Sequence, residues 1–140
     1  MKISTKGRYA LRMLIDLAEN RERGFVSLRD IAERQDISKK YLEQIVPLLN
    51  KSDYLLTNRG FQGGYQLAME PDQYIVGHVL RLTEGSLAPV ACLDKPKRGD
   101  GCGRCDDCIT LDMWKDFYRV ITDYLDNITL QDLLDRKFSI

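Results

Sequence analysis

The chain has 140 residues, of which 44% are hydrophobic and 30% charged, with 21 basic and 21 acidic side chains. This composition predicts one globular domain and excludes a membrane-spanning chain, because no run of about 18 apolar residues occurs. The charge is uneven: residues 1–65 carry 12 Lys or Arg and 8 Asp or Glu, whereas residues 66–140 carry 9 and 13. A basic first half indicates that this half meets phosphate groups. We expect a cytoplasmic protein.

Three helices are predicted in the first fifty residues. Apolar residues recur at helical spacing over residues 7–19. A second, short helix is predicted to start after Ser27, an N-cap candidate, and to end near Gln35. Ser38 is the N-cap candidate of the third helix, whose last turn Pro47 should bend or loosen.

The second and third of these helices, joined by a tight turn, predict a helix-turn-helix unit. In such a unit the second helix lies in the major groove of DNA and presents its N-terminal residues to base edges. We expect its exposed residues to be Lys39, Lys40, Glu43 and Gln44, side chains that bind phosphates or read bases. The alternative is a helical core with a solvated, charged outer face.

A β-hairpin is predicted directly after this unit. Residues 55–57 and 65–67 suit two strands, and the glycine-rich stretch between them suits a turn. A hairpin in this place is the wing of a winged helix, and Arg59 at its tip is placed to enter a minor groove. The alternative is a hairpin arginine that only faces solvent. A further short helix closed by Gly85 completes a predicted DNA-binding domain over residues 1–85.

Residues 86–108 are a predicted loop that holds all four cysteines of the chain, namely Cys92, Cys102, Cys105 and Cys108. Cytosolic thiols at Cys-x2-Cys-x2-Cys spacing are ligands more often than disulfides. Four thiolates suit an iron–sulfur cluster or a tetrahedral zinc ion. A thiol redox switch is less favoured, because the loop's four bases and four acids leave no net field to stabilise a thiolate. A loop without any cofactor is the remaining alternative.

Residues 109–128 predict one long helix. Its apolar residues follow heptad steps of three and four: Leu111, Trp114, Tyr118, Ile121 and Leu125. Such a row packs either on the chain's own domain or on the same row of a second copy. We expect a dimer interface, because a rod of about 27 Å is long for a domain of this size. Residues 129–140 predict a last short helix, capped by Thr129, and a tail.

Four segments resemble the Rrf-two (Rrf2) family of winged-helix transcription regulators: "KISTKGRYALRMLIDLA", "SLRDIAERQDISKKYLEQIVPLL", "RGFQGGYQLA" and "ITLQDLL". The most specific pieces are "YLEQ" after the turn and "RGxxGGY" in the wing. The resemblance covers nearly the whole chain. It implies a mainly α fold with a small β-hairpin wing, a homodimer held by the long C-terminal dimerisation helix, and palindromic operators in double-stranded DNA. The DNA-contacting positions of the family correspond to Lys40, Glu43, Gln44 and Arg59.

The cysteines resemble those of the IscR-like branch of this family, which holds a [2Fe–2S] cluster on three cysteines in the loop before the long helix. Cys92, Cys102 and Cys108 match these three, and the match is anchored by "CITLDMW". The resemblance therefore implies an iron–sulfur cluster, of the [2Fe–2S] type, as the cofactor that controls operator binding.

The fourth ligand is where the chain departs from that branch. The histidine that follows the third cysteine by three residues there corresponds to Leu111, which cannot ligate. We expect Cys105 to take its place and to give an all-cysteine site. The alternatives are Asp106, Asp107 or a group of the partner subunit.

Two other functions of the same fold stay open. One is a zinc-stabilised or thiol-redox regulator. The other is a CymR-like repressor of cysteine metabolism that acts with a protein partner, although that branch of the family lacks the loop cysteines. An enzyme is not expected, because the sequence shows no nucleophile–base pair and no phosphate-binding loop.

Overall fold

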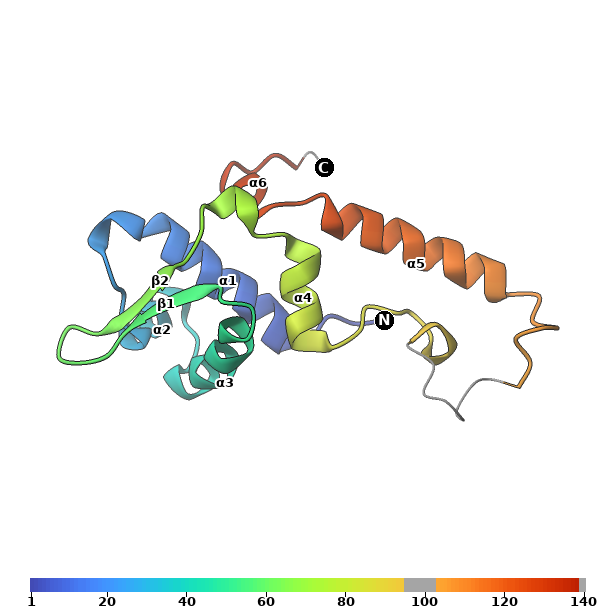
Figure 1. The fold of residues 1–140 in the computed structure, drawn as a ribbon, viewed down its shortest axis with the longest axis horizontal. Helices are drawn as coiled ribbons and strands as arrows, with labels where there is room; N and C mark the ends of the chain where they lie inside the picture. Colours follow the sequence, from blue (N-terminus) through green and yellow to red (C-terminus); the bar gives the residue numbers. More distant parts are fainter. Residues whose placement is uncertain (95–102, 139–140) are drawn as a thin grey trace.

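The computed structural model describes residues 1–94 and 103–138. Its helices are α1 (Thr5–Glu19), α2 (Leu28–Gln35), α3 (Lys39–Asn50), α4 (Val76–Glu84), α5 (Leu111–Asp126) and α6 (Leu130–Leu134). Two strands, β1 (Leu55–Asn58) and β2 (Gly64–Leu67), form an antiparallel hairpin, and short 3₁₀ turns lie at Arg21–Arg23, Pro71–Gln73 and Ala91–Leu93. The predicted mainly α fold with a small hairpin wing is confirmed (Figure 1). No described helix is both long and apolar enough to cross a membrane.

The helix starts follow from hydroxyl caps that the sequence predicts. Ser27, Ser38 and Thr129 each accept a hydrogen bond of 3.1 Å from the backbone amide three residues further on. Each cap satisfies an amide that the first turn of a helix leaves without a partner. The third helix of the chain continues past Pro47 to Asn50.

The turn between α2 and α3 is fixed by one left-handed residue and one buried side chain. Asp36 caps α2 with φ 52° and ψ 51°, a conformation that aspartate tolerates better than most residues. Ile37 is 5% exposed, and its amide donates to the Ala32 carbonyl at 3.1 Å. The turn is therefore anchored in the core, which fixes the direction in which α3 leaves it.

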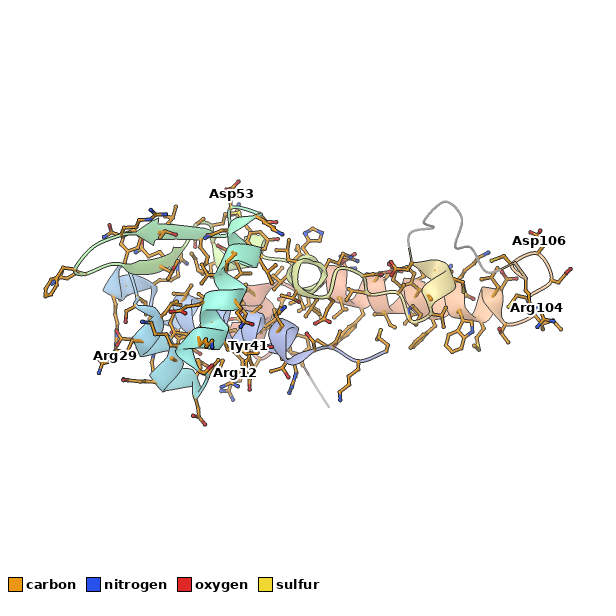
Figure 2. The ribbon with its side chains drawn as sticks, turned by 90° about the horizontal axis from the view of Figure 1, so that it is seen from below. Arg12, Arg29, Tyr41, Asp53, Arg104 and Asp106 are labelled. Atoms are coloured by element: carbon orange, nitrogen blue, oxygen red, sulfur yellow. The ribbon has the colours of Figure 1, made fainter. Side chains whose placement is uncertain are left out.

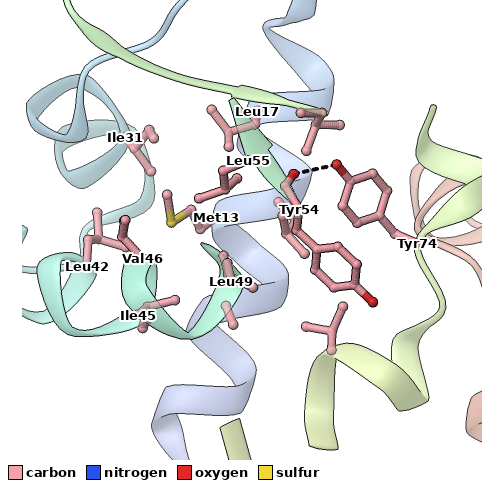
Figure 3. Packing of buried hydrophobic residues seen from close by; sticks show 14 of the residues in the cluster. Met13, Leu17, Ile31, Leu42, Ile45, Val46, Leu49, Tyr54, Leu55 and Tyr74 are labelled. Atoms are coloured by element: carbon pink, nitrogen blue, oxygen red, sulfur yellow. Dashed lines mark hydrogen bonds between the residues drawn. The ribbon is translucent and has the colours of Figure 1, made fainter. Parts of the chain in front are cut away.

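The hydrophobic core lies between α1, the helix-turn-helix unit and the hairpin (Figure 3). Its fully buried side chains come from all three helices and include Met13, Leu17, Ile31, Leu42, Ile45 and Leu49. The Tyr74 hydroxyl, which lies at the edge of this core, donates to the Tyr54 carbonyl at 2.6 Å and accepts from the Ala68 amide at 3.0 Å. A buried hydroxyl needs such partners, and these bonds tie both ends of the hairpin to the segment before α4.

A buried ion pair that the sequence analysis did not single out joins α1 to α2. Asp16 is 1% exposed and accepts two hydrogen bonds from Arg34, at 2.8 and 3.0 Å, and one from Gln35 at 3.1 Å. The hydrogen bond to Asp16 raises the pKa of the Arg34 guanidinium. Since Arg34 and Gln35 close α2, the pair holds the residues that lead into the turn before α3.

Asp16→Ala is expected to lower the free energy of unfolding by about 3 kcal/mol, the lower end of the range for breaking a buried pair, because Arg34 keeps part of its side chain in water. Urea unfolding followed by circular dichroism measures this. The control is Glu33→Ala, which removes an exposed pair with Arg29 and should change stability by less than about 0.5 kcal/mol. Equal losses for the two variants would contradict a stabilising role for Asp16.

Helix α5 packs on the rest of the chain near its C-terminal end. Tyr118 and Leu125 contact a small buried cluster made of Val76, Leu80, Leu87 and Ile128. Arg81 of α4 also donates two hydrogen bonds to Asp126, at 2.6 and 3.0 Å. Figure 1 shows the first turns of α5 extending away from the body formed by α1–α4 and the hairpin. Among the described residues, the start of α5 therefore has fewer packing partners than its end.

Candidate DNA interface, cysteine loop and helix α5

The first half of α3 presents four polar side chains to solvent: Lys39, Lys40, Glu43 and Gln44. The opposite face of the same helix is buried in the core through Leu42, Ile45, Val46 and Leu49. Residues four apart on a helix are neighbours, so the four polar groups form one surface. Within the described chain, no side-chain hydrogen bond or ion pair engages any of them. They are the four residues predicted to read DNA, and the fold leaves all of them accessible.

An aromatic contact fixes the start of α3 against α1. The Tyr41 ring meets the Tyr9 ring edge-to-face at a centroid distance of 5.4 Å. The Arg12 guanidinium lies 5.2 Å from the centre of the Tyr9 ring, and Arg12 also donates to Gln35 at the end of α2. Figure 2 shows Arg12 next to Tyr41 of α3. These contacts restrain the angle at which α3 is presented, and the sequence analysis did not identify them.

The hairpin has the form predicted for a wing. Its register pairs Leu55 with Leu67 and Asn58 with Gly64, which leaves residues 59–63 as the connecting loop. Figure 1 shows this loop projecting from one end of the molecule. Arg59, which was predicted to enter a minor groove, therefore lies in the exposed loop of the hairpin.

Backbone contacts hold the wing in a defined shape. The Gly63 amide donates to the Gly60 carbonyl at 2.9 Å, which closes a β-turn over residues 60–63. Val26 and Tyr65 exchange two backbone hydrogen bonds, of 2.9 and 2.8 Å, just before α2. Gly64 approaches Val26 so closely that a Cβ would lie 2.3 Å from the Val26 carbonyl oxygen. The base of the wing is thereby attached to the segment that leads into the helix-turn-helix unit.

A cleft of about 560 Å³ separates the wing from the helices, and three cations line it: Arg29, Lys39 and Arg59. No acidic side chain is among the described residues that line this cleft. The start of α2, behind its cap Ser27, adds the partial positive charge of a helix N-terminus. Cations grouped in this way bind phosphates. Arg29 was not among the residues predicted to bind DNA. Its place in the first turn of α2 was a signal, because that helix crosses the DNA backbone in helix-turn-helix proteins.

Three of the four predicted cluster ligands lie in the described part of the chain, and Cys102 lies outside it. Cys92 is exposed in the last 3₁₀ turn, Cys105 is exposed, and Cys108 is half-buried directly before α5. Figures 1 and 2 both place that 3₁₀ turn and residues 103–110 at the end where α5 begins. The three described cysteines therefore lie at one end of the molecule, opposite the wing.

The Cys108 thiol has surroundings that favour ligation. Its Sγ lies 3.4 Å from the Thr110 hydroxyl oxygen, and that contact, followed by the Thr110 and Leu111 amides, lowers the pKa of the thiol. Metal ions and iron–sulfur clusters bind the thiolate form. The donor set of the loop thus fits a thiolate-bound cofactor. Across residues 1–94 and 103–138, no three His, Cys, Asp or Glu side chains are grouped closely enough to hold a metal ion.

The two aspartates named as alternative ligands are both exposed. Figure 2 shows Asp106 at the outer edge of the loop, near Arg104.

Helix α5 carries two apolar rows. The predicted row is half-buried in the single chain and consists of Leu111, Trp114, Tyr118, Ile121 and Leu125. The second row, called here the outer row, is 43–61% exposed and consists of Met113, Phe117, Val120 and Tyr124. The outer row also follows heptad steps, of four, three and four, which the sequence analysis did not use. Large apolar side chains in such a continuous row indicate a contact with another surface.

The family model for Rrf2, described as an iron-dependent transcriptional regulator, matches residues 3–136. The chain belongs to the Rrf2 family. The HTH-type transcriptional regulator IscR of Pectobacterium carotovorum subsp. carotovorum (strain PC1) is 38% identical to this Rrf2 chain over 137 residues, 98% of this chain and 81% of that protein.

Two solved structures are similar to this Rrf2 chain over nearly its whole length. T. potens IscR superposes with a TM-score of 0.77 at 38% identity, covering 99% of this chain and 89% of that one. CymR (YrzC), the global cysteine regulator of B. subtilis, superposes with a TM-score of 0.77 at 35% identity, covering 97% and 98%. This Rrf2 chain is accordingly a DNA-binding transcriptional regulator, and the regulators it resembles support a role that is not enzymatic.

Proposed function

We propose that the protein is a cytoplasmic, homodimeric regulator whose binding to palindromic operators is controlled by an iron–sulfur cluster, of the [2Fe–2S] type, on its cysteine loop. In this proposal residues 1–85 bind DNA, residues 86–108 carry the cofactor and residues 109–128 pair the subunits. The observation that carries it is the cation-lined cleft between wing and helices, which lies beside the accessible polar face of α3.

The docking follows from these surfaces. The start of α3 enters the major groove with Lys40, Glu43 and Gln44 toward the bases, and the wing reaches the neighbouring minor groove with Arg59. Arg29 and Lys39, which line the cleft between them, meet the phosphates of the intervening backbone. Two copies related by a two-fold axis read two half-sites, which requires a palindromic operator.

The cofactor would be held by thiolates of Cys92, Cys102, Cys105 and Cys108, with zinc as the less favoured occupant. When bound, an iron–sulfur cluster supplies a redox-sensitive and oxygen-sensitive group to the loop. The chain's own contribution is the donor set and the Thr110 contact that favours the Cys108 thiolate.

Arg59→Ala is expected to weaken operator binding, because a phosphate-neutralising cation is lost. The logarithm of the association constant should also fall less steeply with the logarithm of the salt concentration, by about 1 in slope per subunit. Gel shifts over a salt series measure both quantities. Arg136→Ala, which removes an exposed arginine after α6, is the control and should follow the parent line. If Arg59→Ala also follows the parent line, the wing assignment is wrong.

Glu43→Ala is expected to relax sequence preference while affinity is kept. The carboxylate accepts a hydrogen bond from cytosine N4 only at the right base and repels phosphates everywhere, so it discriminates more than it binds. Selection from a random duplex pool measures the preference. The matched control is Asp53→Asn, which removes an exposed acid beyond the end of α3 (Figure 2). An unchanged consensus for Glu43→Ala would refute its role as a base reader.

A second candidate is a CymR-like repressor without a cofactor, acting with a protein partner. It is favoured by B. subtilis CymR, which superposes with the same TM-score as T. potens IscR and is covered over 98% of its length. Metal analysis of anaerobically prepared protein separates the candidates. Iron with sulfide and visible absorbance supports the cluster, one zinc per chain without colour supports the zinc form, and neither metal supports the CymR-like form.

A further inference from the structure

The wing tip carries an aromatic residue in addition to its cation. Phe61 has a relative exposure of 102%, so no residue that the structure describes covers its ring. It occupies the second position of the β-turn closed by the bond from the Gly63 amide to the Gly60 carbonyl, a corner from which side chains point outward. The turn thus presents the ring at the part of the wing furthest from the core.

The surroundings of Phe61 indicate what it contacts. Arg59 lies two residues before it on the same loop, and the cleft behind the loop is lined by Arg29, Lys39 and Arg59 without an acidic side chain among its described residues. A second hollow, of about 550 Å³, lies on the Phe25 side of the wing, and Phe61 stands at its rim without filling it. The hollow that Phe61 lines also holds Arg23 and Asp30, one charge of each sign, so the unopposed cation beside the ring is Arg59 of the same loop. An apolar ring next to a cation matches a polyanion that also has apolar walls, which is the minor groove of duplex DNA.

We propose that Phe61 enters the minor groove beside Arg59 and makes the apolar contact of the wing with the deoxyribose walls of the groove. This inference rests on the proposed binding of the wing to DNA. The two residues of the tip then have different roles: Arg59 neutralises phosphate charge, and Phe61 buries apolar surface against the groove. Only the first of these effects releases counterions, so only the first depends on salt.

The two effects are separable in one experiment. The probe is a duplex selected from a random pool by the parent protein, and its affinity is measured by fluorescence anisotropy from about 50 to 200 mM salt. Phe61→Ala should lower affinity roughly tenfold at every salt concentration, as expected for loss of one buried aromatic ring, and give a line parallel to that of the parent. Phe61→Leu, which keeps an apolar side chain, should recover most of the loss.

Leu56→Ala is the matched control, because Leu56 is an apolar residue on β1 that is 49% exposed but lies outside the tip. It should bind as the parent does. Since Phe61 is fully exposed among the described residues, Phe61→Ala should unfold at the same temperature as the parent, and equal unfolding temperatures exclude misfolding as the cause of a loss of binding.

Salt-dependence lines of the parent and Phe61→Ala that are parallel and about tenfold apart in affinity support the inference. An affinity equal to that of the parent overturns it, and so does a loss that appears only as a change of slope, because the ring would then act through the placement of Arg59. Unchanged DNA binding combined with weaker regulation of a polymerase in vitro would also overturn it and assign the ring to a protein contact. A parent protein that selects no duplex would refute the proposed function itself, before any variant is compared.

Discussion

Val120→Asp and Ile121→Asp are each expected to give protein that sediments as a monomer and binds the operator about a hundredfold or more weakly. The two residues represent the outer row and the predicted row of α5. A carboxylate placed in an apolar interface is desolvated without a partner, which costs several kcal/mol, and a two-fold interface incurs that cost twice. A monomer then holds one half-site only and loses the gain from joint binding of both.

The two variants have different uses. Ile121 is half-buried in the single chain, so its replacement also endangers the fold of α5. Val120 is 61% exposed, and its replacement should leave the single chain folded. Lys115→Asp, which places the same charge at an exposed polar position of α5, is the control and should remain a dimer. A Val120→Asp protein that is a folded, DNA-binding dimer would place the interface away from the outer row, and the same result for Ile121→Asp would exclude the predicted row.

Serine replacement of Cys92, Cys102, Cys105 or Cys108 is expected to abolish the visible absorbance of protein reconstituted without oxygen. Each loss removes one of four thiolates, and no histidine follows Cys108 by three residues to replace it, since Leu111 stands there. For the same reason the reduction potential of the parent should be lower than that of mixed cysteine–histidine [2Fe–2S] sites.

Cys105 is the decisive member of this set. If Cys105→Ser keeps the spectrum and potential of the parent while the other three variants lose the cluster, a three-cysteine site stands and another group closes it. Asp106→Asn is the matched control: it should retain the cluster if the site is all-cysteine and lose it if the aspartate is the fourth ligand.

Local signals made most of the fold predictable. The hydroxyls of Ser27, Ser38 and Thr129 marked three helix starts correctly, because a cap is a contact between residues three apart in sequence. The hairpin was equally predictable, since a glycine-rich stretch between two short strand-forming segments favours a turn that pairs them. The exposure of Lys39, Lys40, Glu43 and Gln44 followed from the apolar stripe on the other face of α3.

Contacts between distant residues were not predictable in this way. Asp16 and Arg34 are 18 positions apart, and nothing local distinguishes this buried aspartate from the exposed acids around it. The cleft that brings Arg29 to Arg59 depends on how the hairpin folds back on α2. In α5 both apolar rows have heptad spacing, so periodicity alone could not tell which row packs on α4 and which stays uncovered.

Control of DNA binding by the cysteine loop is tested most directly by the operator affinity of one anaerobic preparation, measured before and after its cluster is removed. Coupling between a cofactor site and a DNA site predicts that the two forms differ by about tenfold or more, within the usual range for linked sites. Cys108→Ser should bind with the affinity of the cluster-free form under both conditions. Equal affinity of the two parent forms for the selected operator, at the same salt concentration, would contradict control of DNA binding by the cysteine loop.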